Sequence, residues 1–208
     1  MELLTCYGSL RRGEEPVPYE RPEVRFADFV AEELAALKSE EHAGYWRGLV
    51  AEHTPFALPD EWGDRTADGA KHQAIADWRD LKPRLREAAA AAGVSMKCVM
   101  ITAFTKVLAQ LTDEEAFHFG LITDARPERL GADTVYGMYL NTLPFAVRRP
   151  TGTWRDLLRA TFDREVQMWP HRQFPYPEIT RMADKRRRFI DVSLIVGSVR
   201  CVYETGSW

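Results

Sequence analysis

The chain has 208 residues, of which 45% are hydrophobic and 28% charged, and its formal net charge is −3. That length suffices for one domain with its own core, and the composition is ordinary for a soluble globular protein. A slightly acidic chain gives no electrostatic reason to expect nucleic acid or an anionic membrane as a partner.

The N-terminus and the cysteines favour a cytoplasmic protein without a membrane segment. Residues 1–15 show neither a basic leader with a long apolar centre nor a cleavage site, so no signal peptide is expected. No apolar run approaches the roughly 18 residues that a transmembrane helix needs. Cys6, Cys98 and Cys201 are odd in number and far apart, and we interpret them as reduced thiols.

The first quarter of the chain predicts three helical segments. Residues 2–9 are typical of the end of a helix, and residues 11–22 predict an extended connection. Apolar residues then recur at helical spacing over 26–37 and 45–50, which predicts two amphipathic helices with a break near Ser39.

The next segment predicts a loop, a short strand and a helix. Residues 55–70 hold two prolines, two glycines and alternating charge, a composition typical of a loop. Weak alternation over 71–78 predicts a strand. A helix is expected from Asp80, as its cap, through Pro83 in the first turn to Gly93 at the end.

The second half of the chain predicts alternating helices and strands. The expected elements are a mostly buried helix over 95–111, strands over 116–123 and 141–147, a helix over 153–169, and a strand over 190–196. In the helix over 153–169, Thr153 and Asp156 form a capping box. Its apolar stripe comprises Trp154, Leu157, Leu158, Thr161, Phe162 and Val166. Interleaved strands and helices predict an α/β or α+β domain with a helix-covered sheet.

Familiar catalytic and metal-binding motifs do not occur in the sequence. It contains no Cys-x-x-Cys, no His-Glu-x-x-His, no phosphate loop, no dinucleotide fingerprint and no Gly-x-Ser-x-Gly. We interpret its widely separated histidines as surface or satisfied core residues: His42, His53, His72, His118 and His171. The basic run over 184–188 is interpreted as a solvated helix end, with a docking patch as the alternative. These residues alone predict no particular function.

Four segments carry motifs that occur together in one known family. Residues 25–29 read RFADF, residues 136–148 read YGMYLNTLPFAVR and residues 171–179 read HRQFPYPEI, while residues 93–128 combine a helix, a turn, a strand and Ala-Arg-Pro. In this order they resemble the condensation domain of nonribosomal peptide synthetases, a member of the chloramphenicol-acetyltransferase-like superfamily. The corresponding family motifs are Tyr-x-Asp-Phe, Ile-Gly-x-Phe-Val-Asn-Thr, His-Gln-Asp-Val-Pro-Phe-Glu and Gly-Arg-Pro.

The sequence departs from the family at its catalytic signature. His-His-x-x-x-Asp-Gly does not occur, and residues 1–4 resemble the helix that follows it, so the catalytic histidine is expected upstream of Met1. Residues 186–199 only poorly resemble the family's Arg-Asp-x-Ser-Arg-Asn-Pro-Leu motif. We therefore expect a partial condensation domain, with the end of an N-terminal lobe over 1–20 and mostly C-terminal lobe over 21–208.

The resemblance implies an acyltransferase fold, a mixed sheet with covering helices, and a role in amide bond formation. Donor and acceptor are expected as phosphopantetheine thioesters on peptidyl carrier domains, with no cofactor or metal bound by this chain. The other expected partners are the missing N-terminal lobe or neighbouring synthetase domains, and a homodimer through an exposed lobe surface. Without the signature histidine, the isolated chain is expected to be inactive and to supply tunnel wall and carrier docking.

The resemblance also implies roles for individual residues. The substrate-tunnel residues are Gly137, Tyr139, Asn141 and Thr142, with Asn141 facing the cleft. The structural motif residues are Phe26, Asp28, Phe29, Pro144, Arg148, His171, Pro175 and Tyr176. As an alternative, Asn141 satisfies nearby backbone groups in a structural turn.

Two other functions remain open from the sequence. The chain is alternatively a non-catalytic module that binds a carrier protein or a partner lobe, or a related acyltransferase of the same superfamily. A lobe that normally packs against another should expose an apolar patch larger than the few hundred Å² usual for monomers.

Overall fold

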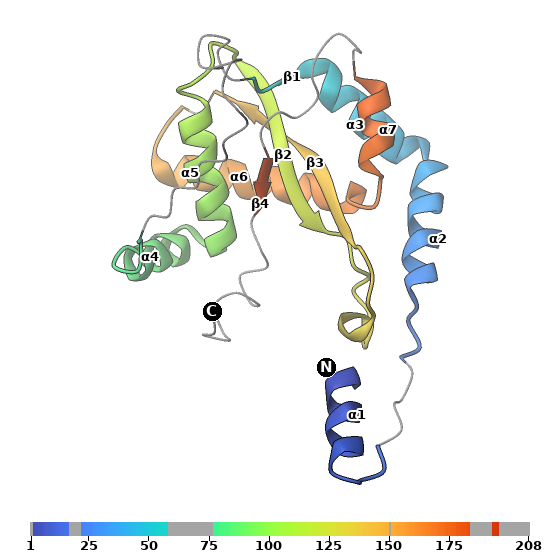
Figure 1. Ribbon diagram of the computed structural model, residues 1–208. Coiled ribbons are helices and arrows are strands. Elements are labelled where there is room, and N and C mark those ends of the chain that lie inside the picture. Colours follow the sequence, from blue (N-terminus) through green and yellow to red (C-terminus); the bar gives the residue numbers. More distant parts are fainter. Residues whose placement is uncertain (1, 17–21, 58–76, 150, 184–192, 196–208) are drawn as a thin grey trace, which may run out of the picture.

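The computed structural model describes residues 2–16, 22–57, 77–149, 151–183 and 193–195 (Figure 1). The helices within these ranges are α1 (Glu2–Arg11), α2 (Phe26–Leu37), α3 (Glu40–Glu52), α4 (Lys82–Ala92), α5 (Met96–Leu108), α6 (Trp154–Met168) and α7 (Tyr176–Met182), with 3₁₀ turns η2 (Ala132–Thr134) and η3 (Trp169–His171). The strands are β1 (Thr54–Pro55), β2 (Ala116–Asp124), β3 (Leu140–Arg148) and β4 (Ser193–Ile195).

The sheet is mixed and is built around β2. Strand β3 pairs with β2 along its whole length in antiparallel register, with Phe119 opposite Phe145 and Thr123 opposite Asn141. On the other side of β2, β1 and β4 both pair with it in parallel. The sheet confirms the predicted fold class of mixed α and β structure with covering helices.

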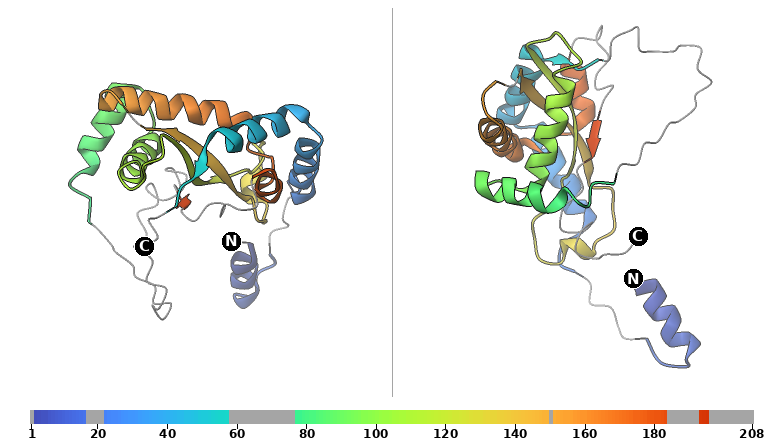
Figure 2. Two further views of the ribbon diagram at one scale, coloured as in Figure 1. Left: turned by 90° about the horizontal axis from the view of Figure 1, so that it is seen from above. Right: turned by 90° about the vertical axis from the view of Figure 1, so that its left-hand side faces the viewer.

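The longer helices surround the paired strands. In Figure 1, α6 passes behind β2 and β3, with α4 and α5 on one side and α3 and α7 on the other. The view from above in Figure 2 shows the same arrangement. Helix α5 packs against both α4 and α6, while α3 packs against α7.

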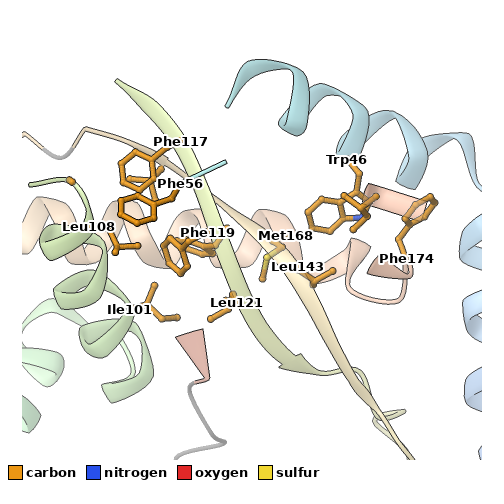
Figure 3. Packing of buried hydrophobic residues seen from close by; sticks show 14 of the residues in the cluster. Trp46, Phe56, Ile101, Leu108, Phe117, Phe119, Leu121, Leu143, Met168 and Phe174 are labelled. Atoms are coloured by element: carbon orange, nitrogen blue, oxygen red, sulfur yellow. The ribbon is translucent and has the colours of Figure 1, made fainter. Parts of the chain in front are cut away.

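One main core fills the space between the sheet and these helices (Figure 3). Alternate residues of β2 and β3 point into it, and α3, α5, α6 and α7 add large apolar side chains. The strands contribute Phe117, Phe119, Leu121, Leu143, Phe145 and Val147, and the helices contribute Trp46, Ile101, Leu108, Met168 and Ile179. Phe56 and Phe174, from the segments after β1 and η3, complete it.

Local capping explains several element boundaries. The hydroxyls of Ser39 and Ser95 accept hydrogen bonds from the backbone N–H groups of His42 and Cys98 at 3.3 and 3.1 Å. These bonds confirm the predicted break near Ser39 and the start of α5. Gly93 ends α4 in the left-handed region, with φ of 69°, as predicted.

The capping box of α6 is confirmed, but its predicted stripe is only half buried. Thr153 and Asp156 exchange both bonds of the box. Leu157, Leu158 and Thr161 are buried, whereas Trp154, Phe162 and Val166 are exposed. Periodicity identified the helix but overestimated the width of its buried face.

Other expectations were wrong or lie outside the described residues. Asp80 does not cap α4, because the helix begins at Lys82 after Leu81, which makes no side-chain cap. Pro55 belongs to β1 rather than to the predicted loop. Of the strand expected over 71–78, residues 77 and 78 are not in a strand and the others lie outside the described ranges. The strand expected over 190–196 is present at 193–195, its described part.

No single helix among the described residues meets the length and apolarity of a bilayer span. Together, α4 and α5 pass that test as a pair bent by 100°. Buried helices of globular proteins pass the same test, and α5 carries six buried residues.

Candidate functional site

The predicted tunnel residues lie where the chain enters β3, and α2 packs against this segment. The Tyr139 ring meets the Phe26 and Phe29 rings edge-on, with centroid distances of 5.2 and 5.1 Å. Phe29 and Tyr139 are buried in a small cluster separate from the main core. The Tyr-x-Asp-Phe-like and Asn-Thr-containing motifs are therefore in contact.

Gly137 is required by this contact. A Cβ atom at Gly137 would overlap the Phe26 ring, which the Tyr139 and Phe29 rings hold in place. The glycine thus permits close approach of α2 to the backbone before β3.

Asn141 connects β3 to the segment before α7. Its side-chain amide donates to the carbonyls of Arg172 and Phe174 at 3.0 and 2.9 Å, and its oxygen accepts from the Tyr176 backbone N–H at 3.2 Å. Its exposed fraction is 9%. Both amide N–H groups are occupied, so the geometry favours the structural alternative raised from the sequence over a free donor facing a cleft.

His171 fastens the same segment to α3. Its Nδ1 lies 2.7 Å from Nδ1 of His42, its ring stacks on Tyr45 with centroids 4.0 Å apart, and its carbonyl accepts from Trp46 Nε1 at 3.2 Å. Burial, with a smaller contribution from His42, lowers the pKa of His171. One of the two imidazoles must be neutral to accept the hydrogen bond, which agrees with that direction.

Gln173 links the segment before α7 to α2 and to the residue that follows β2. Its amide nitrogen donates to the Ala125 carbonyl at 2.9 Å and to the Glu32 carboxylate at 3.2 Å. Glu32 also pairs with Arg129 at 3.3 Å. We call this assembly the β3-entry junction, formed by Phe26, Phe29, Arg126, Tyr139, Asn141, His171 and Gln173.

Alternation along the junction separates inward from outward side chains. Tyr139 and Asn141 are buried, whereas the exposed fractions of Tyr136, Met138 and Leu140 are 77%, 71% and 62%. Thr142 is half-buried and points to the opposite sheet face from Asn141. The structure therefore does not bring Thr142 together with the other three predicted tunnel residues.

The remaining motif residues are spread along the fold. Asp28 accepts from the Arg25 backbone N–H at 2.8 Å at the start of α2, and this bond lowers the pKa of its carboxyl. Pro144 is buried in the middle of β3 opposite Gly120, while Arg148, at the far end of the strand, lies 3.8 Å from Glu52.

Pro175 and Tyr176 lie at the start of α7. Pro175 is the residue immediately before the helix and Tyr176 is its first residue. Burial raises the pKa of Tyr176. Both therefore belong to the segment whose backbone Asn141 holds.

Sequence reasoning missed Arg126 and Gln173. Arg126 Nη1 donates to the carbonyls of Ala132 and Val135 at 2.6 and 2.7 Å, and its guanidinium lies 4.0 Å above the Tyr139 ring. The Ala-Arg-Pro string placed Arg126 in a motif, but nothing local identified these partners.

Two other described histidines, His118 and His53, are not among the residues of the junction. His118 is buried in β2, and its burial lowers its pKa to about 4. His53 follows α3, and burial lowers its pKa as well. Within the ranges that the structure describes, no group of three or more His, Cys, Asp or Glu side chains is arranged to hold a metal ion.

A separate apolar pocket of about 350 Å³ lies between the start of α5 and the end of α6. Phe162, Val166 and Trp169 line it, together with the ion pair of Lys97 and Glu165. Sequence analysis did not predict this pocket, whose lining residues are not among those that form the junction.

Comparison with known proteins gives a consistent family. The family model described as "Condensation domain" matches residues 1–201. AMB antimetabolite synthetase AmbE of Pseudomonas aeruginosa is 31% identical over 86% of this chain, and a plipastatin synthase of Bacillus subtilis is 25% identical over 91%. This chain spans only 8% of the length of each relative.

A solved structure supports the fold. The first condensation domain of the CDA synthetase superposes with a TM-score of 0.73 over 94% of this chain, at 20% identity. The match covers 44% of that protein's chain. At 20% sequence identity, this structural similarity shows the fold alone.

Proposed function

This chain belongs to the condensation-domain family of nonribosomal peptide synthetases, and from that premise we propose that it contributes to amide bond formation between two carrier-bound substrates. The observation that carries the proposal is the family match over residues 1–201. We assign residues 1–20 to the end of an N-terminal lobe and residues 21–208 mostly to a C-terminal lobe.

The proposed reaction is attack of an acceptor amine on a donor thioester. A C–N bond forms, the C–S bond breaks, the phosphopantetheine thiol of the donor carrier leaves, and the amine loses a proton. The sequence has no adjacent pair of histidines, so we assign the proton acceptor to a segment outside this chain. This chain's contribution is proximity and orientation.

The β3-entry junction supplies one wall of the proposed substrate tunnel. Gly137, Tyr139 and Asn141 hold the backbone of this wall through the contacts described above. The side chains that it presents outward are Tyr136, Met138 and Leu140. Their apolar surface suits the alkyl part of an acyl or phosphopantetheine group better than a charged group. Thr142 presents a hydroxyl on the other sheet face.

The decisive experiment joins this chain to a lobe that carries His-His-x-x-x-Asp-Gly. Donor and acceptor amino acids are loaded onto separate carrier domains, and the product on the acceptor carrier is measured by mass spectrometry. We expect amide formation in this two-lobe protein and none when the second histidine of the signature is replaced by alanine. If no donor–acceptor pair from a broad panel gives product, the proposed function is wrong.

The alternative function is that of a non-catalytic module that binds a partner lobe or a carrier protein. The exposed apolar face of α1 favours it, since Leu3, Leu4, Tyr7 and Leu10 are all at least 60% exposed. Binding of a carrier domain by the two-lobe protein, without any amide formation, would support this alternative.

A further inference from the structure

The loop between β2 and β3 is closed on itself and leads into the junction. Its ends are joined by the hydrogen bond from the Ala125 N–H to the Tyr139 carbonyl, at 2.9 Å. Between them, Gly131 adopts a left-handed φ of 81° and η2 makes a single turn. Pro127 and Leu130 lie in the loop between β2 and η2, and the exposed fraction of Leu130 is 99%. An exposed loop of this length needs internal contacts to hold one conformation.

Arg126 provides these contacts. One guanidinium nitrogen reaches two backbone carbonyls, those of Ala132 and Val135, while the guanidinium plane covers the Tyr139 ring. The Arg126 backbone N–H donates to Asp124 at 2.9 Å, which fixes the start of the loop. Arg126 thus contacts the loop near its start through its backbone, and the middle and end of the loop through its side chain.

We propose that Arg126 is a positioning residue: by holding Tyr139 and the 132–135 turn, it fixes the extended segment 136–142 for the condensation reaction. This inference rests on the proposed function for its catalytic part. Arg126 itself touches no substrate. It acts through Tyr139, whose position decides the direction of the outward side chains on either side of it, Met138 and Leu140.

The physical basis is the shape of the guanidinium group. Its planar fork presents several fixed donors and also stacks on aromatic faces. A lysine can keep the charge and one hydrogen bond but cannot bridge two carbonyls and cover a ring together. A displacement of about 1 Å in a positioning segment can reduce a reaction rate about a hundredfold.

We call the contacts of Arg126 with Ala132, Val135 and Tyr139 the Arg126 clamp. Hydrogen exchange of the chain tests this clamp independently of activity. We expect Arg126→Ala to raise the exchange rates of amides 131–139 tenfold or more, with those of β2 and the rest of β3 unchanged. Leu130→Ala is the matched control, because Leu130 lies in the same loop, is 99% exposed and is not part of the junction. Equal exchange in the two variants would overturn the clamp, as would loss of protection throughout the sheet in Arg126→Ala.

Kinetics of the two-lobe protein test the catalytic part. We expect Arg126→Ala to lower kcat ten- to a hundredfold with KM for both carriers within twofold, Arg126→Lys to recover part of the loss, and Leu130→Ala to match the unsubstituted protein. A kcat for Arg126→Ala equal to that of Leu130→Ala would overturn the positioning role. Inactivity of the unsubstituted two-lobe protein would instead overturn the proposed function, while the exchange experiment still decides the clamp.

Discussion

At the scale of single residues, the buried Asn141 and the half-buried Gln173 hold the proposed tunnel wall by completing backbone hydrogen bonds. Asn141 satisfies two carbonyls and one N–H of the 172–176 segment, and Gln173 satisfies the Ala125 carbonyl. These segments are not in regular structure, so their backbone groups depend on such side chains. If such a side chain is removed, the free energy of unfolding falls, because the buried backbone groups that it bonded are left unpaired.

Asn141→Ala should therefore lower stability before it affects chemistry. We expect the free energy of unfolding to fall by roughly 1–3 kcal/mol, because buried carbonyls lose their donors. Denaturant unfolding measures this, with Thr142→Ala, on the opposite sheet face, as the control. In the two-lobe protein, turnover per folded molecule should stay within threefold. Unchanged stability combined with slow turnover would restore a direct substrate role for the Asn141 amide.

His118 should make the protein sensitive to acid. Its burial lowers its pKa from 6.5 to about 4, so unfolding in this range is accompanied by proton uptake. The stabilisation from neutral His118 is present above about pH 6.5 and is lost as the pH falls through 4. The loss amounts to up to about 3 kcal/mol.

Unfolding curves of the wild type and of His118→Gln between pH 7 and pH 4 measure this contribution. The free energy of unfolding of the variant should fall less steeply than that of the wild type as the pH is lowered. We assign the fall that remains in the variant to His53 and His171, whose pKa values are also lowered. Parallel pH profiles for the two proteins would assign the acid sensitivity to other groups.

At the scale of elements, α2 and the segment before β3 are coupled through one close contact. Phe26 occupies the space that a side chain at Gly137 would need. Helix α2 also contacts this segment through the Phe29 and Tyr139 rings, and its Glu32 contacts the segment before α7 through the hydrogen bond from Gln173. The position of α2 is therefore linked to that of the proposed tunnel wall.

Gly137→Ala should be destabilising by about 1–3 kcal/mol, the usual cost of overpacking. In the Phe26→Ala background, the same substitution should cost much less, because the overlapping ring is gone. A double-mutant cycle on denaturant unfolding measures the coupling energy, which we expect to exceed about 1 kcal/mol. Additive effects of the two substitutions would show that Gly137 does not depend on α2.

The elements themselves were largely predictable because their signals are local. Each capping residue lies within four residues of the group that it caps, as Ser39, Ser95, Thr153 and Gly93 do. The apolar residues of α5 and β2 also follow one another closely in the sequence. Strand β1 was not predictable, because two residues carry no periodicity and its only support is pairing with β2.

The contacts of the junction could not be predicted in the same way. The partners of Asn141 lie 31 to 35 residues farther along the chain, and His42 and His171 are 129 residues apart. Resemblance located the motifs, but the choice between a substrate contact and a backbone contact for Asn141 depends on tertiary geometry. For the same reason, Arg126 was overlooked.

At the scale of the whole molecule, α1 stands clear of the other helices (Figures 1 and 2). Helix α2 adds further exposed apolar residues, namely Val30 and Leu34, to those of α1. A helix with an uncovered apolar stripe usually marks an interaction surface. We propose that these side chains belong to the exposed apolar patch expected from the sequence.

Substitution of two α1 leucines should reduce self-association. We expect Leu3→Gln/Leu10→Gln to raise the apparent dissociation constant in sedimentation equilibrium on the order of tenfold or more. Each substitution removes apolar area that the leucine would bury in the dimer. Glutamine preserves helix propensity. Leu130→Gln, at an exposed leucine outside α1, is the control and should leave association unchanged. A monomeric wild type, or equal effects of both variants, would contradict this role for α1.

The central proposal is that this chain orients substrates while a segment outside it supplies the proton acceptor for amide formation. The most direct measurement is amide formation by the isolated chain, from carrier-bound donor and acceptor pairs that the two-lobe protein converts. We predict no product above the uncatalysed background at any pH between 6 and 9. Product formed by the chain alone, and abolished when one of its own histidines is replaced, would contradict the account.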